Sequence, residues 1–202
     1  MLNSKLMNND DTSYRFLKRT IDLLGALAAA LLLWWLFVLI WLGVKSTSRG
    51  PAIFAQARVG RGESVFTCYK FRTMHVGTKQ VGTHEVGAAA VTKFGTYLRR
   101  TKLDELPQIV NILRNEMSFV GPRPCLPTQQ ALVEARRSRN VFDLKPGITG
   151  LSQVRNIDMS APEQLALSDA QYLAQRSVIL DLRLIFVTVF GAGRGDKVGS
   201  NE

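Results

Sequence analysis

The chain has 202 residues, which is room for one domain together with a membrane anchor. Its 26 lysines and arginines against 16 acidic residues give a net charge of +10, which suits nucleic acid, anionic lipid headgroups or a phosphorylated substrate. Two cysteines, Cys68 and Cys125, and two histidines match no metal-binding spacing, which argues against a structural zinc site and predicts reduced, packed thiols.

A long apolar run lies close to the N-terminus. Residues 1–14 are polar and are predicted to be flexible, whereas the 22 residues from Leu23 to Val44 carry no charge. About 20 apolar residues are enough to cross a bilayer, so this run is long enough to span one. It is too long for a secretory signal peptide, and no cleavage site of small residues follows it.

The residues around this run leave its topology open. Cations prefer the cytoplasmic side of a membrane, and they flank the run at both ends, at Arg15, Lys18, Arg19, Lys45 and Arg49. A re-entrant helix would keep both ends on one side. However, a bend usually needs a proline, serine or threonine near its middle, and this run has Trp34 and Trp35 there. The residues alone therefore favour a straight span slightly over a re-entrant helix.

Short strands are expected after the membrane segment. Two β-rich runs on either side of Gly60-Arg61-Gly62 predict a hairpin over residues 52–72. Lys70 and Arg72 alternate with aromatic residues in the second run, which by itself indicates a half-buried strand with a solvated face. Residues 76–92 are rich in glycine, alanine and threonine without periodicity, which predicts a mobile loop of the kind that forms lids.

Three helices are expected in the second half of the chain. Apolar residues between 106 and 113 fall on one helical face, with Pro107 in the first turn, where proline is tolerated. Residues 162–175 also have a helical pattern. Residues 178–190 are strongly apolar but include Asp181 and Arg183, which fits either a buried helix or a helix lying on the membrane surface.

Two adjacent carboxylates, Asp104 and Glu105, are the strongest indication of chemistry. Neighbouring side chains on a helix diverge by roughly 100°, so the two do not form a facing acid–base pair. One carboxylate can instead attack phosphorus and form an acyl phosphate, while the other holds Mg²⁺, which prefers hard oxygen ligands. An isolated Asp-Glu pair is more often a solvated helix start, where acids favour the helix dipole.

Arginines lie on both sides of this pair. Arg99 and Arg100 precede it, and Arg123 follows in Gly-Pro-Arg-Pro, where two prolines stiffen the backbone around one guanidinium. The guanidinium fork matches phosphate oxygens, although each segment alone also fits a basic helix end or a surface turn. Two carboxylates between such cations point to chemistry on a phosphate.

Several motifs occur together in one order over roughly residues 15–190. They are Arg58-Val-Gly60, residues 69–74 (YKFRTM), 98–108 (LRRTKLDELPQ), 117–124 (MSFVGPRP), 145–150 (KPGITG) and 180–183 (LDLR). In these motifs the chain resembles the bacterial sugar transferase family. It resembles in particular the small monotopic phosphoglycosyl transferases, which begin glycan assembly on a polyprenol carrier.

This resemblance implies a fold and a location. The fold would be α+β and helix-dominated, with a re-entrant membrane helix and turn over residues 15–50 and flexible segments at 1–14 and 191–202. Residues 51–190 would form a compact catalytic domain with a small β-hairpin and interfacial amphipathic helices. Because UDP-sugars are cytoplasmic, this domain would face the cytoplasm from the bacterial inner membrane, in contact with membrane lipids. A homo-oligomer is allowed, and nucleic acid is not an expected partner.

The resemblance also implies a reaction. The family transfers a phospho-sugar from a UDP-sugar to polyprenyl phosphate, usually undecaprenyl phosphate, and releases UMP. Asp104 would be the nucleophile that forms a phosphosugar-aspartyl intermediate, and Glu105 would act with Mg²⁺, for which both carboxylates are candidate ligands. The expected substrate-binding residues are Lys70, Arg72, Arg99, Arg123 and Asp169, the last of which would orient Arg123 through an ion pair.

Three positions depart from the family's pattern, and one alternative function remains. The Ser-Pro pair that usually breaks the membrane helix is missing, Lys102 stands where serine is usual, and Leu151-Ser152 replaces the common Trp-Ala. The alternative is a membrane-anchored basic protein that binds anionic lipid or nucleic acid without turnover. The lack of a recognisable nucleic-acid module argues against it. No motif identifies the sugar.

Overall fold

The computed structural model describes residues 2–78 and 90–191, and helices dominate it. The elements in chain order are α1 (Leu2–Thr47), β1 (Ile53–Val59), η1 (Arg61–Glu63), β2 (Val65–Phe71), α2 (Lys93–Arg100), η4 (Leu103–Gln108), α3 (Ile109–Leu113), β3 (Ser118–Val120), α4 (Gln130–Arg137), η5 (Val141–Asp143), β4 (Gly147–Thr149), α5 (Leu151–Val154), α6 (Pro162–Gln175) and α7 (Val178–Val189). This confirms the helix-dominated α+β class. Most of the predicted lid and all but the first residue of the predicted tail lie outside the described residues.

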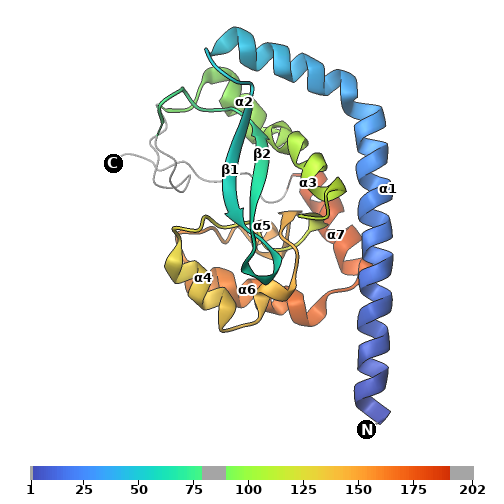
Figure 1. The fold of residues 1–202 in the computed structure, drawn as a ribbon. Coiled ribbons are helices and arrows are strands. Elements are labelled where there is room, and N and C mark those ends of the chain that lie inside the picture. The colour runs from blue at the N-terminus through green and yellow to red at the C-terminus, as the bar shows by residue number, and fades with distance from the viewer. Residues whose placement is uncertain (1, 79–89, 192–202) are drawn as a thin grey trace.

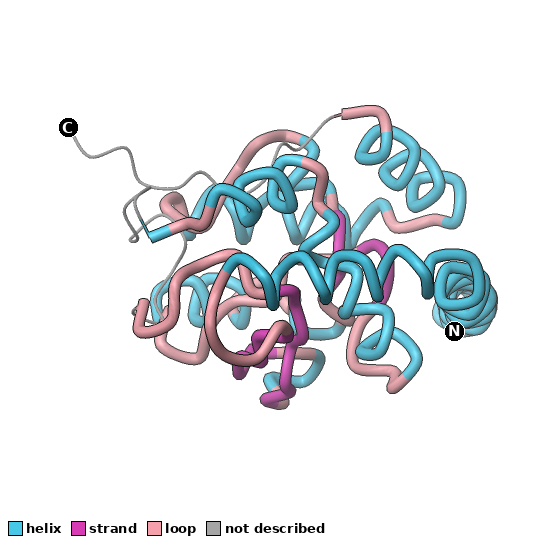
Figure 2. The backbone as a smooth tube through the Cα atoms, turned by 90° about the horizontal axis from the view of Figure 1, so that it is seen from above, coloured by secondary structure: helices cyan, strands magenta, loops and turns pink. Residues whose placement is uncertain are grey.

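The long helix α1 is bent and mostly uncovered (Figure 1). Its first part runs along one side of the molecule and its last part turns across the top, which the view from above also shows (Figure 2). The helix includes residues 2–14, for which the sequence predicts a flexible segment. Over Thr12–Thr47 it is long and apolar enough to cross a membrane, and only 11% of its most apolar window is buried. A core helix of a soluble protein would be mostly buried.

Polar contacts hold α1 to the domain before the apolar run begins. The carboxylate of Asp22 accepts hydrogen bonds from the Ser118 hydroxyl (3.0 Å) and the Phe119 amide (3.2 Å) at the start of β3. One turn earlier, the Arg19 guanidinium donates to the Ile112 carbonyl (2.7 Å) at the end of α3. These hydrogen bonds therefore fix α1 to β3 and α3 just before its apolar run begins.

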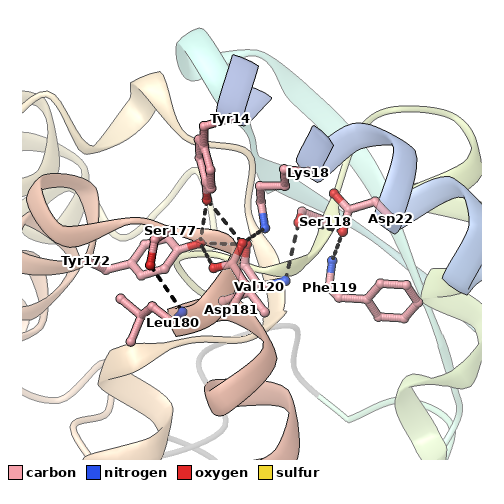
Figure 3. A network of polar contacts seen from close by, with 10 residues as sticks. All are labelled: Tyr14, Lys18, Asp22, Ser118, Phe119, Val120, Tyr172, Ser177, Leu180 and Asp181. Atoms are coloured by element: carbon pink, nitrogen blue, oxygen red, sulfur yellow. Dashed lines mark hydrogen bonds and ion pairs between the residues drawn. The ribbon is translucent and has the colours of Figure 1, made fainter. Parts of the chain in front are cut away.

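A second polar network joins α1 to the last two helices (Figure 3). Asp181 on α7 accepts hydrogen bonds from Lys18 (2.7 Å) and Tyr14 (3.1 Å) of α1 and from Tyr172 of α6 (2.6 Å). Tyr172 is 2% exposed and Asp181 is 8% exposed, so the network is shielded from water. Buried polar groups of this kind define one arrangement of the helices because each needs its partners.

The last part of α1 contacts the same domain through apolar side chains. Ile40 and Val44 pack in one core cluster with Phe71 of β2 and Leu98 of α2. Earlier on the helix, Ala26 packs in a different cluster with Met117. The two ends of the apolar run are therefore both attached to the domain, while the side chains between them are largely exposed.

The predicted hairpin is confirmed. Strands β1 and β2 pair antiparallel, from Ile53 opposite Phe71 to Val59 opposite Val65. The turn between them needs a positive φ of 61° at Gly62, which glycine adopts without strain. The predicted helices at 162–175 and 178–190 are confirmed as α6 and α7, and both cysteines are free and buried as expected. The predicted helix at 106–113 begins instead within a tight 3-10 turn, η4, and continues as α3.

Candidate active site

The two adjacent carboxylates lie on a tight turn that is buried in spite of its charge. Asp104 and Glu105 belong to η4, and their exposed fractions are 8% and 6%. The turn follows Lys102, whose positive φ of 58° ends the helical path of α2. The Glu105 amide donates to the Lys102 carbonyl (3.1 Å). Burial of two carboxylates is costly unless cations offset it, so this turn depends on its neighbours.

Cations from two other elements hold Glu105. Its Oε1 accepts hydrogen bonds from Nζ of Lys70 on β2 (2.8 Å) and from Nη1 of Arg123, which follows β3 (3.0 Å). In both ion pairs, each side chain is at least four-fifths shielded from water. The hairpin and the helical part of the domain therefore meet at the acid pair. Lys70 and Arg123 lie together as the sequence predicts.

The environment of Asp104 favours its protonated form. Burial and, next, the neighbouring Glu105 charge raise the pKa of Asp104 to about 6, although the charges of Lys70, Arg99 and Arg123 act in the opposite direction. At neutral pH the group is largely ionised but poorly hydrated. A carboxylate in that state is well suited to attack an electrophile, because less water must be removed first.

Glycines place Arg123 by allowing two backbones to touch. The Gly121 amide donates to the Thr149 carbonyl and the Gly147 amide to the Pro122 carbonyl, both at 2.9 Å, which extends the parallel β3–β4 pair. A Cβ atom at Gly147 would lie 2.1 Å from the Gly121 amide nitrogen, so no larger residue fits there. The stiff Gly-Pro-Arg-Pro segment is therefore fixed on the strand pair before its side chain reaches Glu105.

A buried arginine that the sequence analysis missed supports the same segment from behind. Arg136 on α4 is 2% exposed, and its Nη1 donates to the Arg123 carbonyl (2.9 Å). Its Nε and Nη2 donate to Asp169 (2.9 and 2.7 Å), whose other oxygen accepts from Ser152 (2.6 Å). The predicted ion pair between Asp169 and Arg123 is therefore wrong. Asp169 acts on the backbone of Arg123 through Arg136, and in sequence Arg136 is one of several arginines in a basic run.

The other two predicted cations have different positions. Arg99 on α2 donates from Nε to the Thr73 hydroxyl (2.9 Å), and its charge acts on Asp104, so it belongs to the site. Arg72 instead donates to the hydroxyl and carbonyl of Ser48, where the chain leaves α1. The structure therefore places Arg72 at the exit of the membrane helix, although it is only two residues from Lys70.

Comparison with known proteins identifies the family. Residues 13–194 match the model for bacterial sugar transferases. The chain belongs to this family.

Relatives in the family fall into longer and shorter proteins. The chain is 38% identical over 201 residues to a UDP-galactose-lipid carrier transferase of Erwinia amylovora, covering 88% of this chain and 40% of the relative. It is 37% identical over 190 residues to a UDP-glucose:undecaprenyl-phosphate glucose-1-phosphate transferase of Escherichia coli (strain K12), covering 87% and 40%. The exopolysaccharide production protein ExoY of Rhizobium meliloti (strain 1021) is 38% identical over 193 residues, covering 85% and 83%. The chain thus spans about two-fifths of the first two relatives.

For a member of this family, the donor set suits one kind of metal site. Within residues 12–78 and 90–191, whose side chains the structure describes, no three His, Cys, Asp or Glu side chains gather into a complete metal centre. Mg²⁺, however, is commonly bound by one or two carboxylates together with substrate phosphates and water. Asp104 and Glu105 fit that role, because a diphosphate would supply the remaining oxygen ligands.

The raised pKa of Asp104 predicts that Asp104→Asn stabilises the folded protein. A carboxyl whose pKa is higher in the folded state destabilises that state when it ionises. This destabilisation of the folded state is small near pH 4, close to the pKa of the unfolded chain, and reaches its full size above pH 6. In detergent with EDTA at pH 8, Asp104→Asn should melt at a higher temperature than the unmodified protein, with a gain of up to roughly 2–3 kcal/mol in unfolding free energy. At pH 4.5 the gain in unfolding free energy should be less than half of that. Equal melting temperatures for the two proteins at both pH values would contradict the assignment.

The position of Arg136 predicts a strong effect of Arg136→Lys on turnover. Lysine keeps the charge but cannot bind both Asp169 and the Arg123 carbonyl as the guanidinium does. We expect kcat/KM to fall by about tenfold to a hundredfold, because Arg123 loses its fixed position. Arg137→Lys on the same helix is the matched control, since Arg137 forms an exposed ion pair with Glu63. If the two variants had equal kinetics, Arg136 would have no positioning role.

Proposed function

We propose that this chain is a phosphoglycosyl transferase that moves a phospho-sugar from a UDP-sugar to polyprenyl phosphate, giving polyprenyl-diphosphate-sugar and UMP. The observation that carries the proposal is the buried Asp104–Glu105 turn with Lys70, Arg99 and Arg123 around it. The names of several relatives, which specify UDP-glucose and undecaprenyl phosphate, support the two substrate classes.

The charges of the site explain how a carboxylate could react with a phosphate. The diphosphate of a nucleotide sugar and the carboxylate of Asp104 are both anionic, and repulsion would keep them apart in water. Cations already fixed in a water-poor site offset this repulsion without reorganising during the reaction, which is typically the largest catalytic contribution. Arg123 matches the task especially well, since its guanidinium is held by its backbone and can bind two oxygens at once.

The proposed chemistry proceeds in two displacements at the same phosphorus atom. A carboxylate oxygen of Asp104 bonds to the β-phosphorus of the donor, the bond from that phosphorus to the bridging oxygen breaks, and UMP leaves with the electron pair. An oxygen of polyprenyl phosphate then bonds to the phosphorus, and the bond to Asp104 breaks, which restores the carboxylate. Such a covalent route lets a soluble donor and a lipid acceptor use the site one after the other.

Glu105 and Mg²⁺ have a supporting role in this proposal. The ion would neutralise charge on the donor diphosphate, with Asp104 and Glu105 as its protein ligands. Glu105 also holds Lys70 and Arg123 in place through its Oε1. It therefore organises the cations of the site whether or not it touches the ion.

We further propose that α1 is re-entrant and that the catalytic domain faces the cytoplasm. A straight helix from Leu23 to Val44 would separate its ends by about 33 Å. In the structure, contacts near both ends join the same domain, at Asp22 and at Val44. Large apolar side chains between them are exposed, including Leu31, Leu32, Trp34, Trp35 and Leu39. Entry and exit on one side also agrees with cations at both ends of the run.

Helix α7 is proposed to lie on the membrane surface beside α1. Its exposed apolar side chains recur at helical spacing, namely Ile179, Leu182, Phe186, Val189 and Phe190. The opposite face carries Asp181 and Leu184, which are buried in the domain. A helix with one apolar face open and one face packed is suited to the headgroup boundary of a bilayer.

The covalent route predicts a burst of UMP without any acceptor. Mixing the purified protein with its UDP-sugar and Mg²⁺ should release up to one UMP per active site, because Asp104 can accept the phospho-sugar only once. Asp104→Asn should show no burst and no turnover with polyprenyl phosphate. Rapid-quench measurement of UMP checks both expectations, and a screen of UDP-sugars identifies the donor.

The matched control for this experiment is Asp143→Asn. Asp143 is an exposed carboxylate in η5, so the burst of this variant should equal that of the unmodified protein. UMP release that strictly requires acceptor would speak for direct transfer in a ternary complex. Near-normal turnover in Asp104→Asn would remove Asp104 as the nucleophile.

The proposed topology predicts the side of the membrane on which the start of α1 lies. Cysteines introduced at the exposed positions Ser13 and Lys93 should both be protected from an impermeant maleimide in intact cells and both react after lysis. The native cysteines are buried, so the unmodified protein gives the background. Labelling at position 13 but not at position 93 in intact cells would show a full span.

A further inference from the structure

Lys102 has a backbone conformation that lysine rarely adopts. Among the described residues, five residues other than glycine have a positive φ, namely Glu63, Lys102, Asn115, Asn140 and Asn156. Three of them are asparagine, which tolerates this region because its short side chain bonds locally. Lysine has no short side-chain acceptor that bonds to its own backbone, so its covalent structure does not favour this conformation. Such strain usually persists where the residue has a further use.

The second exception, Glu63, shows what such a use looks like. Its carboxylate forms two hydrogen bonds with Arg137, at 2.8 and 2.6 Å. An interaction specific to the charged side chain thus accounts for the residue type at that turn. A contact with an anion would be the corresponding use for the ammonium group of Lys102.

The backbone of Lys102 joins two parts of the candidate active site. Its amide donates to the Arg99 carbonyl and its carbonyl accepts from the Glu105 amide, both at 3.1 Å. Lys102 is only partly exposed, although a lysine usually extends fully into water. The chain therefore brings a fourth cation to the edge of the acid pair, in addition to Lys70, Arg99 and Arg123.

The electrostatic environment agrees with this position. Burial lowers the pKa of Lys102, the Glu105 charge raises it, and the Arg123 charge lowers it. The charge of Lys102 is therefore attracted by Glu105 and repelled by Arg123. A bound anion would relieve the repulsion from Arg123 and compensate for the lost hydration.

We propose that Lys102 is a further phosphate-binding residue, whose ammonium contacts a substrate phosphate at the Asp104–Glu105 turn. The inference rests on the proposed function, since a substrate phosphate must enter this site. Two sources provide that chemistry, the diphosphate of the soluble donor and the phosphate of the lipid acceptor. Lysine suits either one, because its point charge adapts to phosphate oxygens without a fixed fork.

The variant Lys102→Gly removes the ammonium group but keeps a residue that can form the turn. Glycine adopts a positive φ without strain, so the turn should persist and the melting temperature should stay equal or rise. Titration calorimetry with UDP as the probe should show binding weakened by about fivefold to thirtyfold, as expected for loss of one charged contact. Lys102→Arg should retain most of the affinity. Asn140→Gly is the matched control at an exposed turn with the same backbone conformation, a φ of 56°.

Steady-state kinetics distinguish the two phosphates. A raised KM for the UDP-sugar together with weakened UDP binding assigns Lys102 to the donor. A raised KM for polyprenyl phosphate with unchanged UDP binding assigns it to the acceptor. Unchanged UDP binding and unchanged KM for both substrates in a folded Lys102→Gly protein would overturn the proposal. Failure of the unmodified protein to bind UDP or to release UMP would instead reject the proposed function itself.

Discussion

Burial of Asp104 beside Glu105 is the constraint on which the rest of the structure depends. Two neighbouring carboxylates can lie at a site shielded from water only if cations are fixed around them. The hairpin contributes Lys70, α2 contributes Arg99, and the Gly-Pro-Arg-Pro segment contributes Arg123. None of these elements is close to another in sequence, so the acid pair organises the domain. The same arrangement leaves the charge of Asp104 partly uncompensated, in line with its raised pKa, which suits its proposed role as the nucleophile.

Helix α6 connects this site with the membrane helix. Asp169 and Tyr172 lie one turn apart on α6, and both are buried. Asp169 holds Arg136, which binds the carbonyl of Arg123, whereas Tyr172 binds Asp181, which in turn binds Lys18 on α1. One face of α6 thus supports Arg123, the arginine proposed to bind phosphate, and the attachment of the membrane helix. This is a physical reason for keeping the two functions in one compact unit, because a shift of α1 would be transmitted to α6 through buried polar groups rather than through flexible side chains.

Local patterns made part of this arrangement predictable from the sequence. The hairpin follows from two β-rich runs around Gly60 and Gly62, α6 follows from a helical pattern, and α7 follows from a strongly apolar run. The identities of the ion pairs were not predictable in this way. Arg136 lies in the run Ala-Arg-Arg-Ser-Arg, where only packing shows which arginine is buried. Arg72 follows Lys70 on the same face of a strand, yet the strand ends at Phe71 and the side chain reaches Ser48 instead.

The bend of α1 was also not predictable from the sequence of the helix itself. A bent helix is predicted from a helix breaker in its sequence, and this run contains no proline, serine or threonine between Leu23 and Val44. In the structure, Asp22 fixes one end by hydrogen bonds to β3, and Ile40 and Val44 fix the other end in a core cluster with Phe71. Attachment of both ends to one domain holds α1 in its bent path, although the middle of the run contains no usual helix breaker. The energy that holds the bend thus comes from contacts outside the bend, and a missing Ser-Pro pair does not by itself argue for a straight span.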